Sequence, residues 1–129
     1  MTQLFLNEHL DTEPFCSSSS ETTIETFSFS VPADDDYFIS LSIPLTVNNT
    51  SFQVTNAACR VYLNEVLAEK LLFNGGQWTM NNIPFNGRCS GCMCIHLAQG
   101  QHSLIVRGVT SNSATILTLR SRRRYQVFT

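Results

Sequence analysis

The feature that most constrains the fold is a strict two-residue alternation that follows the aspartates at 34–36. In "YFISLSIPLTV" the even positions are mainly polar or small, and the odd positions are apolar: Tyr37, Ile39, Leu41, Ile43, Leu45 and Val47. A period of two places the apolar side chains on one face of an extended strand. The pattern predicts a long strand with one buried face. Pro44, which cannot donate a ladder hydrogen bond, indicates a sheet edge or a bulge.

The same period recurs along the chain between turn signals such as Asn74–Gly76 and Gln99–Gly100. Residues 63–69 are predicted to form the bend of a hairpin, and no convincing long helix is expected. Regularly spaced short strands of this kind are typical of a two-sheet β-sandwich. We therefore predict an all-β, jelly-roll-like sandwich of about eight strands over residues 23–129. Residues 1–22, which end in "CSSSSETT", are expected to form an extended N-terminal arm.

The surface is poor in charge. Only 14% of the 129 residues are charged, against about a quarter in a typical globular chain. Residues 1–36 hold acids and no Lys or Arg, whereas residues 108–129 hold four arginines and no acid. This asymmetry predicts an acidic N-terminal segment lying against a basic C-terminal strand, within one chain or between copies. A nucleic-acid partner is the less favoured alternative, because the net charge is −2.

No run of about 18 apolar residues is present, so we expect no membrane partner. The beginning, "MTQLFLNEHLDTEPF", lacks the basic and then apolar segments of a secretory leader. We therefore expect synthesis in a reducing compartment.

One stretch is rich in metal-ligand chemistry: Cys89, Cys92, Cys94 and His96 lie within eight residues. A Cys-x-x-Cys pair followed by two further ligands could hold zinc, and Cys16 or Cys59 could complete such a site if folding brings them near. A disulfide is a second alternative, and packed free thiols are a third. No cofactor is expected, with zinc at this stretch as the alternative; the aspartates at 34–36 lack the spacing of a calcium loop and are expected to form a solvated turn.

The sequence lacks the common catalytic motifs. We find no phosphate loop, nucleophile elbow or paired catalytic carboxylates, so an enzyme is not expected. Trp78 and Tyr62 are candidates for stacking on a sugar ring.

Two hairpins carry a family resemblance. "FSVPADDDYFISLSIPL" resembles the hairpin that opens small viral and complement-type jelly rolls. "LAQGQHSLIVRG" resembles the L-x-x-G-x-H-x-L-x-V hairpin found late in such domains, in which Gly100 permits the turn and His102 begins the next strand. This hairpin also occurs in jelly-roll carbohydrate-binding modules, often after a G-x-W like the one ending at Trp78.

The resemblance spans residues 25–110 and implies a jelly roll of the tumour-necrosis-factor-like and viral structural kind. It implies a non-enzymatic virion protein, either a phage head decoration (cement) protein or a short fibre subunit, made in the host cytoplasm. Such a protein would form a symmetric homo-oligomer, with a trimer expected, and would contact the major capsid protein or another virion protein. The alternative is a host-glycan-binding module that uses Trp78.

The expected assembly contacts lie at both ends of the chain. Leu4, Phe5, Leu6 and Phe15 would anchor the arm on the capsid or a neighbouring subunit. Arg122, Arg123 and Arg124 would pair with acids of an adjacent chain.

Overall fold

The computed structural model of the protein describes residues 3–49, 54–64, 69–81 and 85–129; the side chains of residues 54, 55 and 76–81 are outside the description. The described residues form strands and no helix. The strands are β1 (Leu4–Leu10), β2 (Phe15–Cys16), β3 (Thr22–Val31), β4 (Asp35–Asn49), β5 (Val54–Asn64), β6 (Glu69–Asn81), β7 (Phe85–Leu97), β8 (Gly100–Thr110), β9 (Thr115–Leu119) and β10 (Arg123–Phe128). The expected all-β class is confirmed. No helix in this part of the chain could cross a membrane.

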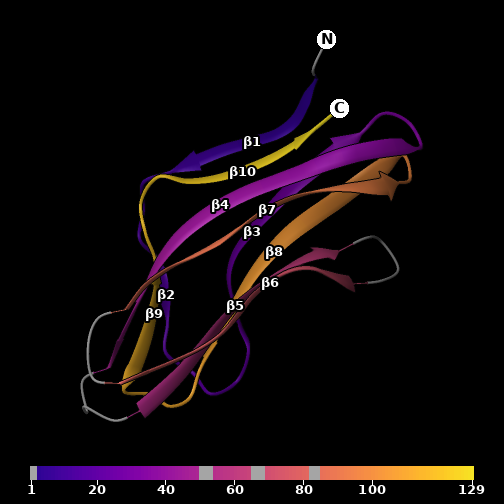
Figure 1. Cartoon of the computed structure of the whole chain (residues 1–129). Coiled ribbons are helices and arrows are strands. Elements are labelled where there is room, and N and C mark those ends of the chain that lie inside the picture. Colours follow the sequence, from indigo (N-terminus) through magenta and orange to yellow (C-terminus); the bar gives the residue numbers. More distant parts are fainter. Residues whose placement is uncertain (1–2, 50–53, 65–68, 82–84) are drawn as a thin grey trace.

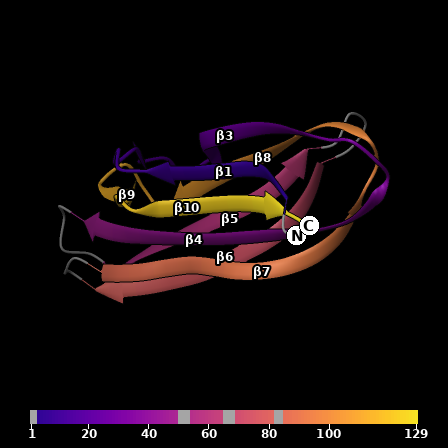
Figure 2. The ribbon, with the colours of Figure 1, turned by 90° about the horizontal axis from the view of Figure 1, so that it is seen from above.

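The strands form two antiparallel sheets that pack face to face (Figure 1). In the six-stranded sheet, β7 pairs with one edge of β4, while β10 and β9 pair with successive halves of the other edge. β1 extends this sheet beyond β10 (Figure 2), and β2 extends it beyond β9 (Figure 1). The four-stranded sheet has the order β3-β8-β5-β6. From β3 to β9 the chain crosses repeatedly between the sheets, which is the winding of a β-sandwich with Greek-key connections.

The central strand β4 is the one that alternation predicts. All six of its odd-numbered apolar side chains, Tyr37 through Val47, are at most 2% exposed. They pack against inward side chains of the other sheet, among them Val61, Leu104 and Val106. Burial of apolar surface on this scale is the main favourable term in the folding of a domain of this size.

The tight turn at the start of β8 is also as predicted. Gly100 has a φ of 125°, a conformation that side-chain-bearing residues rarely adopt. Asp34 of the aspartate run holds this turn in place, because its carboxylate accepts a hydrogen bond from the Gln99 backbone N–H at 2.7 Å. A second hydrogen bond in the turn, of 2.7 Å, joins the His102 ring Nε2 to the Ala98 carbonyl.

The residues Asn74–Gly76, predicted to form a turn, lie inside β6. The pairing of β6 with β5 shifts register between Ala58 and Arg60, so the glycines form a β-bulge. Gly75 is required there, since an added Cβ would lie 2.8 Å from the backbone oxygen of Cys59. Adjacent glycines are a sequence signal both for a turn and for a β-bulge, which explains why the turn predicted at Asn74–Gly76 is wrong. The predicted bend at 63–69 lies largely outside the described residues.

The segment 1–22, expected to form an arm, supplies β1 and β2. β1 pairs with β10 along its length, and backbone bonds of 2.9 and 2.8 Å join Leu119 to Pro14 and Arg122 to Leu10. The described residues form ten strands, whereas about eight were expected, and β1 and β2 account for the difference.

Candidate functional site

An exposed row of apolar side chains crosses the outer face of the six-stranded sheet. It is formed by Leu4 of β1, Phe128 of β10, Phe38 of β4 and Cys94 of β7, which are successive cross-strand partners. The rings of Phe38 and Phe128 stack at 5.5 Å with an interplanar angle of 23°. Leu4 is 49% exposed and Phe38 is 41% exposed. We call these four residues the apolar row.

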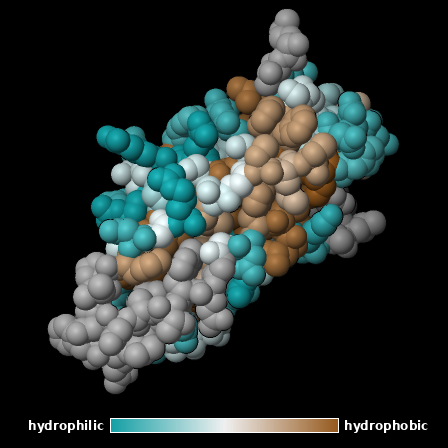
Figure 3. All heavy atoms as spheres, viewed as in Figure 1, coloured by the Kyte–Doolittle hydropathy of each residue, from teal (hydrophilic) through white to brown (hydrophobic). Residues whose placement is uncertain are grey.

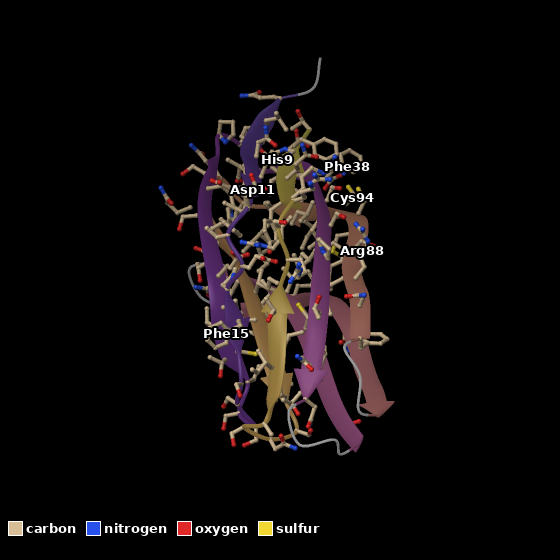
Figure 4. The ribbon with its side chains drawn as sticks, turned by 90° about the vertical axis from the view of Figure 1, so that its left-hand side faces the viewer. His9, Asp11, Phe15, Phe38, Arg88 and Cys94 are labelled. Atoms are coloured by element: carbon tan, nitrogen blue, oxygen red, sulfur yellow. The ribbon has the colours of Figure 1, made fainter. Side chains whose placement is uncertain are left out.

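Figure 3 shows hydrophobic surface where Figure 1 draws the right-hand parts of β4 and β7. In Figure 4, Phe38 and Cys94 lie next to each other near one end of the molecule. Folding into the sandwich alone leaves Leu4, Phe38 and Cys94 exposed and Phe128 half-buried, which is unfavourable for stacked aromatic rings.

Polar side chains border the apolar row on both sides. On one side, the His96 ring Nδ1 and the Asp36 carboxylate are 3.0 Å apart. On the other, Gln126 donates to Asn7 at 3.1 Å, and Ser40 continues this polar row across β4. An apolar patch with a polar rim is the usual composition of a surface that a partner covers.

Of the four predicted anchors, two are exposed and two belong to the sandwich. Leu6 is 6% exposed and lies in the core. Phe5 packs edge-on against the buried Tyr37, with ring centroids 5.2 Å apart. Leu4 joins the apolar row, and Phe15 is 65% exposed in β2. The bulge between Leu4 and Leu6 turns Leu4 outward.

Of the three predicted arginines, Arg123 cannot contact a neighbouring chain, because its side chain is fully buried. It donates to both carboxylate oxygens of Glu25, at 3.1 and 2.6 Å, and to the backbone and side-chain oxygens of Thr12. Arg122 and Arg124 are exposed. Arg122 has a φ of 67° in the turn before β10, and its backbone N–H donates to Leu10 at 2.8 Å.

The acidic and basic ends of the sequence meet within one chain, as one of the two alternatives predicts. Glu25 pairs with Arg123, and Glu13 pairs with Arg120 at 2.9 Å. Tyr125 also donates to Glu25 at 2.7 Å, and burial together with the Glu25 charge raises the pKa of Tyr125.

The cysteine-rich stretch is β7, and its strand geometry divides the predicted zinc ligands. Cys92, Cys94 and His96 share the exposed outer face, whereas Cys89 points into the core and is 2% exposed. Cys89 therefore cannot join the other three around one ion. Among the described residues, no three or more His, Cys, Asp or Glu side chains are grouped so that they could hold a metal. All five cysteines are free thiols.

The two glycan candidates are both in the four-stranded sheet. Trp78 lies in β6 opposite Ala57, and its side chain is outside the described part of the structure. Tyr62 has one ring face covered by the Arg107 guanidinium, 4.8 Å from the ring centroid. Arg107 in turn forms two hydrogen bonds with the Glu69 carboxylate. A sugar could stack only on the other face of Tyr62.

The sequence contains a signal for the residues that the predictions missed. Phe38 and Phe128 occupy even-numbered positions on strands whose odd-numbered side chains are buried. The alternation alone therefore places both on the outer face. Arg123 and Glu25 occupy odd-numbered positions like the buried residues Tyr125 and Phe29 of their strands, so the alternation places both inside. On these strands the position in the alternation, and not the residue type, decides which side chains are buried.

The chain matches no protein-family model and no curated protein sequence. Solved structures do match. Eiger TNF from S. frugiperda is similar over 98% of this chain and 92% of its own, with a TM-score of 0.59 at 10% identity. Murine APRIL is similar over 99% and 98%, with a TM-score of 0.56 at 13% identity. A chain from the infectious bursal disease virus Gx strain matches over all of this chain but only 32% of its own, with a TM-score of 0.54 at 12% identity.

The fold is a jelly roll. At these identities the likeness establishes the jelly roll alone and transfers no activity or partner. The jelly roll is the fold that the resemblance of the two hairpins implies, and it leaves the function to be argued from the surface.

Proposed function

We propose that this chain is a non-enzymatic structural subunit of a virus particle, and that copies of it assemble through the outer face of the six-stranded sheet. The observation that carries the proposal is the apolar row, which the folded monomer leaves exposed. A second copy of the chain is the occupant that we assign to it.

The chemistry of the row supports burial against protein. Two stacked phenylalanines form a rigid anchor that loses little conformational entropy on contact, and aromatic anchors of this kind dominate interface energetics. The row itself holds no charge, whereas Asp36 beside it and the exposed Arg88 and Arg124 further along the same face can set the register between copies. The low overall charge of the chain, 14%, is consistent with a molecule that covers much of its surface with neighbours.

We propose a closed symmetric oligomer, with three copies as the expected number. One copy would present the apolar row and the next would present a different surface, and a rotation that closes such a contact gives a ring. β7 lies at the edge of the six-stranded sheet and contributes Cys94 to the row, so a neighbour seated on the row would also cover that edge.

Attachment to the particle would use a separate contact. Phe15, in the short strand β2, is the most exposed large hydrophobic side chain among the described residues. Figure 4 shows it away from Phe38 and Cys94, and Figure 1 draws β2 and the end of β10 in different parts of the molecule. We assign Phe15 to contact with the major capsid protein or another virion protein, as expected of a head decoration or short fibre subunit of a phage.

The test is the protein content of purified particles of the virus that encodes the chain. We expect the protein at a fixed copy number per particle, measured by quantitative mass spectrometry. The variant Phe15→Ser should keep the oligomer and lose incorporation, while Leu71→Ser, which alters an exposed leucine on the other sheet, should be incorporated normally. Particles without the protein, or full incorporation of Phe15→Ser, would contradict this role.

A further inference from the structure

Two of the buried cysteines meet in the core from opposite sheets. Cys59 lies in β5 of the four-stranded sheet and is 0% exposed, and Cys89 lies in β7 of the six-stranded sheet and is 2% exposed. Each thiol shifts the pKa of the other, and both residues lie beside Gly75. The core therefore holds a pair of neighbouring thiols that spans the two layers of the sandwich.

The β6 bulge explains how two sheets approach closely enough to bring these thiols together. A Cβ added to Gly75 would lie 2.8 Å from the Cys59 backbone oxygen and 3.2 Å from both the Cβ and the Sγ of Cys89. One backbone position thus touches both cysteines, and it can do so only because it has no side chain. Sheets in a sandwich are usually about 10 Å apart, so the bulge marks a point of local approach.

We propose that Cys59 and Cys89 form a dithiol that closes to a disulfide when the protein meets a peroxide, and that this bond links the two sheets covalently. A disulfide between the sheets of a β-sandwich has precedent in immunoglobulin domains. Both cysteines line the same point of the core beside Gly75, and closure would bring their sulfurs to a bond length of about 2.05 Å.

The chemistry balances with hydrogen peroxide as the oxidant. The Cys89 sulfur attacks one peroxide oxygen, the O–O bond breaks, and a sulfenic acid and one water are formed. The Cys59 sulfur then attacks the Cys89 sulfur, the S–OH bond breaks, and the second water leaves. The two thiol protons end in the two waters, and the peroxide is reduced by the two electrons that the sulfurs lose.

We assign the first attack to Cys89, because it is 2% exposed whereas Cys59 is 0% exposed, so the peroxide reaches Cys89 more easily. The third buried thiol, Cys16, packs against Gly108, and burial raises its pKa to about 11. Cys16 stays protonated and is expected to remain free.

The test uses the full chain with the exposed thiols removed by Cys92→Ser and Cys94→Ser, so that only the buried cysteines can react. The protein is purified with reductant, exchanged into buffer, treated with hydrogen peroxide, unfolded in the presence of an alkylating reagent, and mapped by peptide mass spectrometry. We expect a Cys59–Cys89 cross-link with Cys16 alkylated. Thermal unfolding should shift upward by roughly 10 °C, because the bond closes a long loop.

Two further variants keep the result interpretable. Cys16→Ala removes a buried thiol outside the pair and should cross-link as before. Cys89→Ala removes the nucleophile, so peroxide should then leave the melting temperature unchanged. Recovery of alkylated Cys59 and Cys89 after peroxide, a cross-link to Cys16, or overoxidation of Cys89 without a cross-link would each overturn the proposal.

Discussion

The Arg123 guanidinium in β10 and the Glu25 carboxylate in β3 form an ion pair inside the sandwich, 98 positions apart in the sequence. The pair joins the two sheets, because β10 and β3 belong to different ones. Arg123 also donates to the Thr12 oxygens in the segment between β1 and β2. The Arg123 guanidinium of the last strand thereby holds the segment between β1 and β2 in place.

The variant Glu25→Gln should destabilise the fold strongly. It leaves a buried guanidinium without its counter-charge, and breaking one partner of a buried pair typically costs about 3–5 kcal/mol. The free energy of unfolding, measured by urea titration followed by circular dichroism, should fall by about that amount.

Glu13→Gln is the matched control. It removes one carboxylate from a pair in which Arg120 is 51% and Glu13 is 41% exposed, so the change should be within about 1 kcal/mol. Equal effects of the two substitutions would show that Arg123 does not depend on its partner.

Stability should decline through Cys16 as the pH rises from 9.0 to about 11. Burial raises the pKa of this thiol from 9.0 to about 11, so the folded state disfavours the thiolate that the unfolded chain forms readily. Its contribution is fully present below pH 9.0 and is lost between there and about pH 11, at most roughly 3 kcal/mol.

The free energy of unfolding measured from pH 8 to about pH 11 should therefore fall less steeply in Cys16→Ala than in the wild type. The alanine variant will be less stable at neutral pH, since a buried side chain is shortened, so the slope and not the absolute value is compared. Identical slopes would contradict the assignment.

Gly75→Ala should lower the free energy of unfolding by about 1–3 kcal/mol, because the new methyl group meets the backbone of Cys59, which cannot move aside without distorting β5. Gly91→Ala is a useful comparison. There the added carbon meets only ring carbons of the Phe73 side chain, at 2.8 and 3.0 Å, and a ring can shift more easily than a backbone. Thermal melts of both variants should rank Gly75→Ala as the less stable protein.

Much of the fold could be predicted because alternation is a local signal. The buried face of β4, the turn at Gly100 and the shared face of Cys94 and His96 all follow from a period of two along a single strand. The two hairpins carried the resemblance to jelly rolls for the same reason, since their residues encode turn geometry.

Contacts between distant strands could not be predicted in this way. The pairing of β1 with β10 joins the two ends of the chain, and no local pattern specifies that register. The placement of Cys89 and Cys92 on opposite faces could be predicted, because an odd spacing on a strand always places two side chains on opposite faces. The zinc hypothesis needed a loop, and the chain forms a continuous strand there.

The central claim is that copies of the chain cover the apolar row, and the mass of the native protein in solution tests it most directly. Sedimentation equilibrium of the wild type should give three times the chain mass of 14.5 kDa. Phe38→Asp, which places a charge in the row, should give the mass of a single folded chain, while Leu71→Asp, at the exposed leucine of the other sheet, should keep the oligomer. A wild type that stays monomeric at all concentrations, or a Phe38→Asp protein with unchanged mass, would contradict the account.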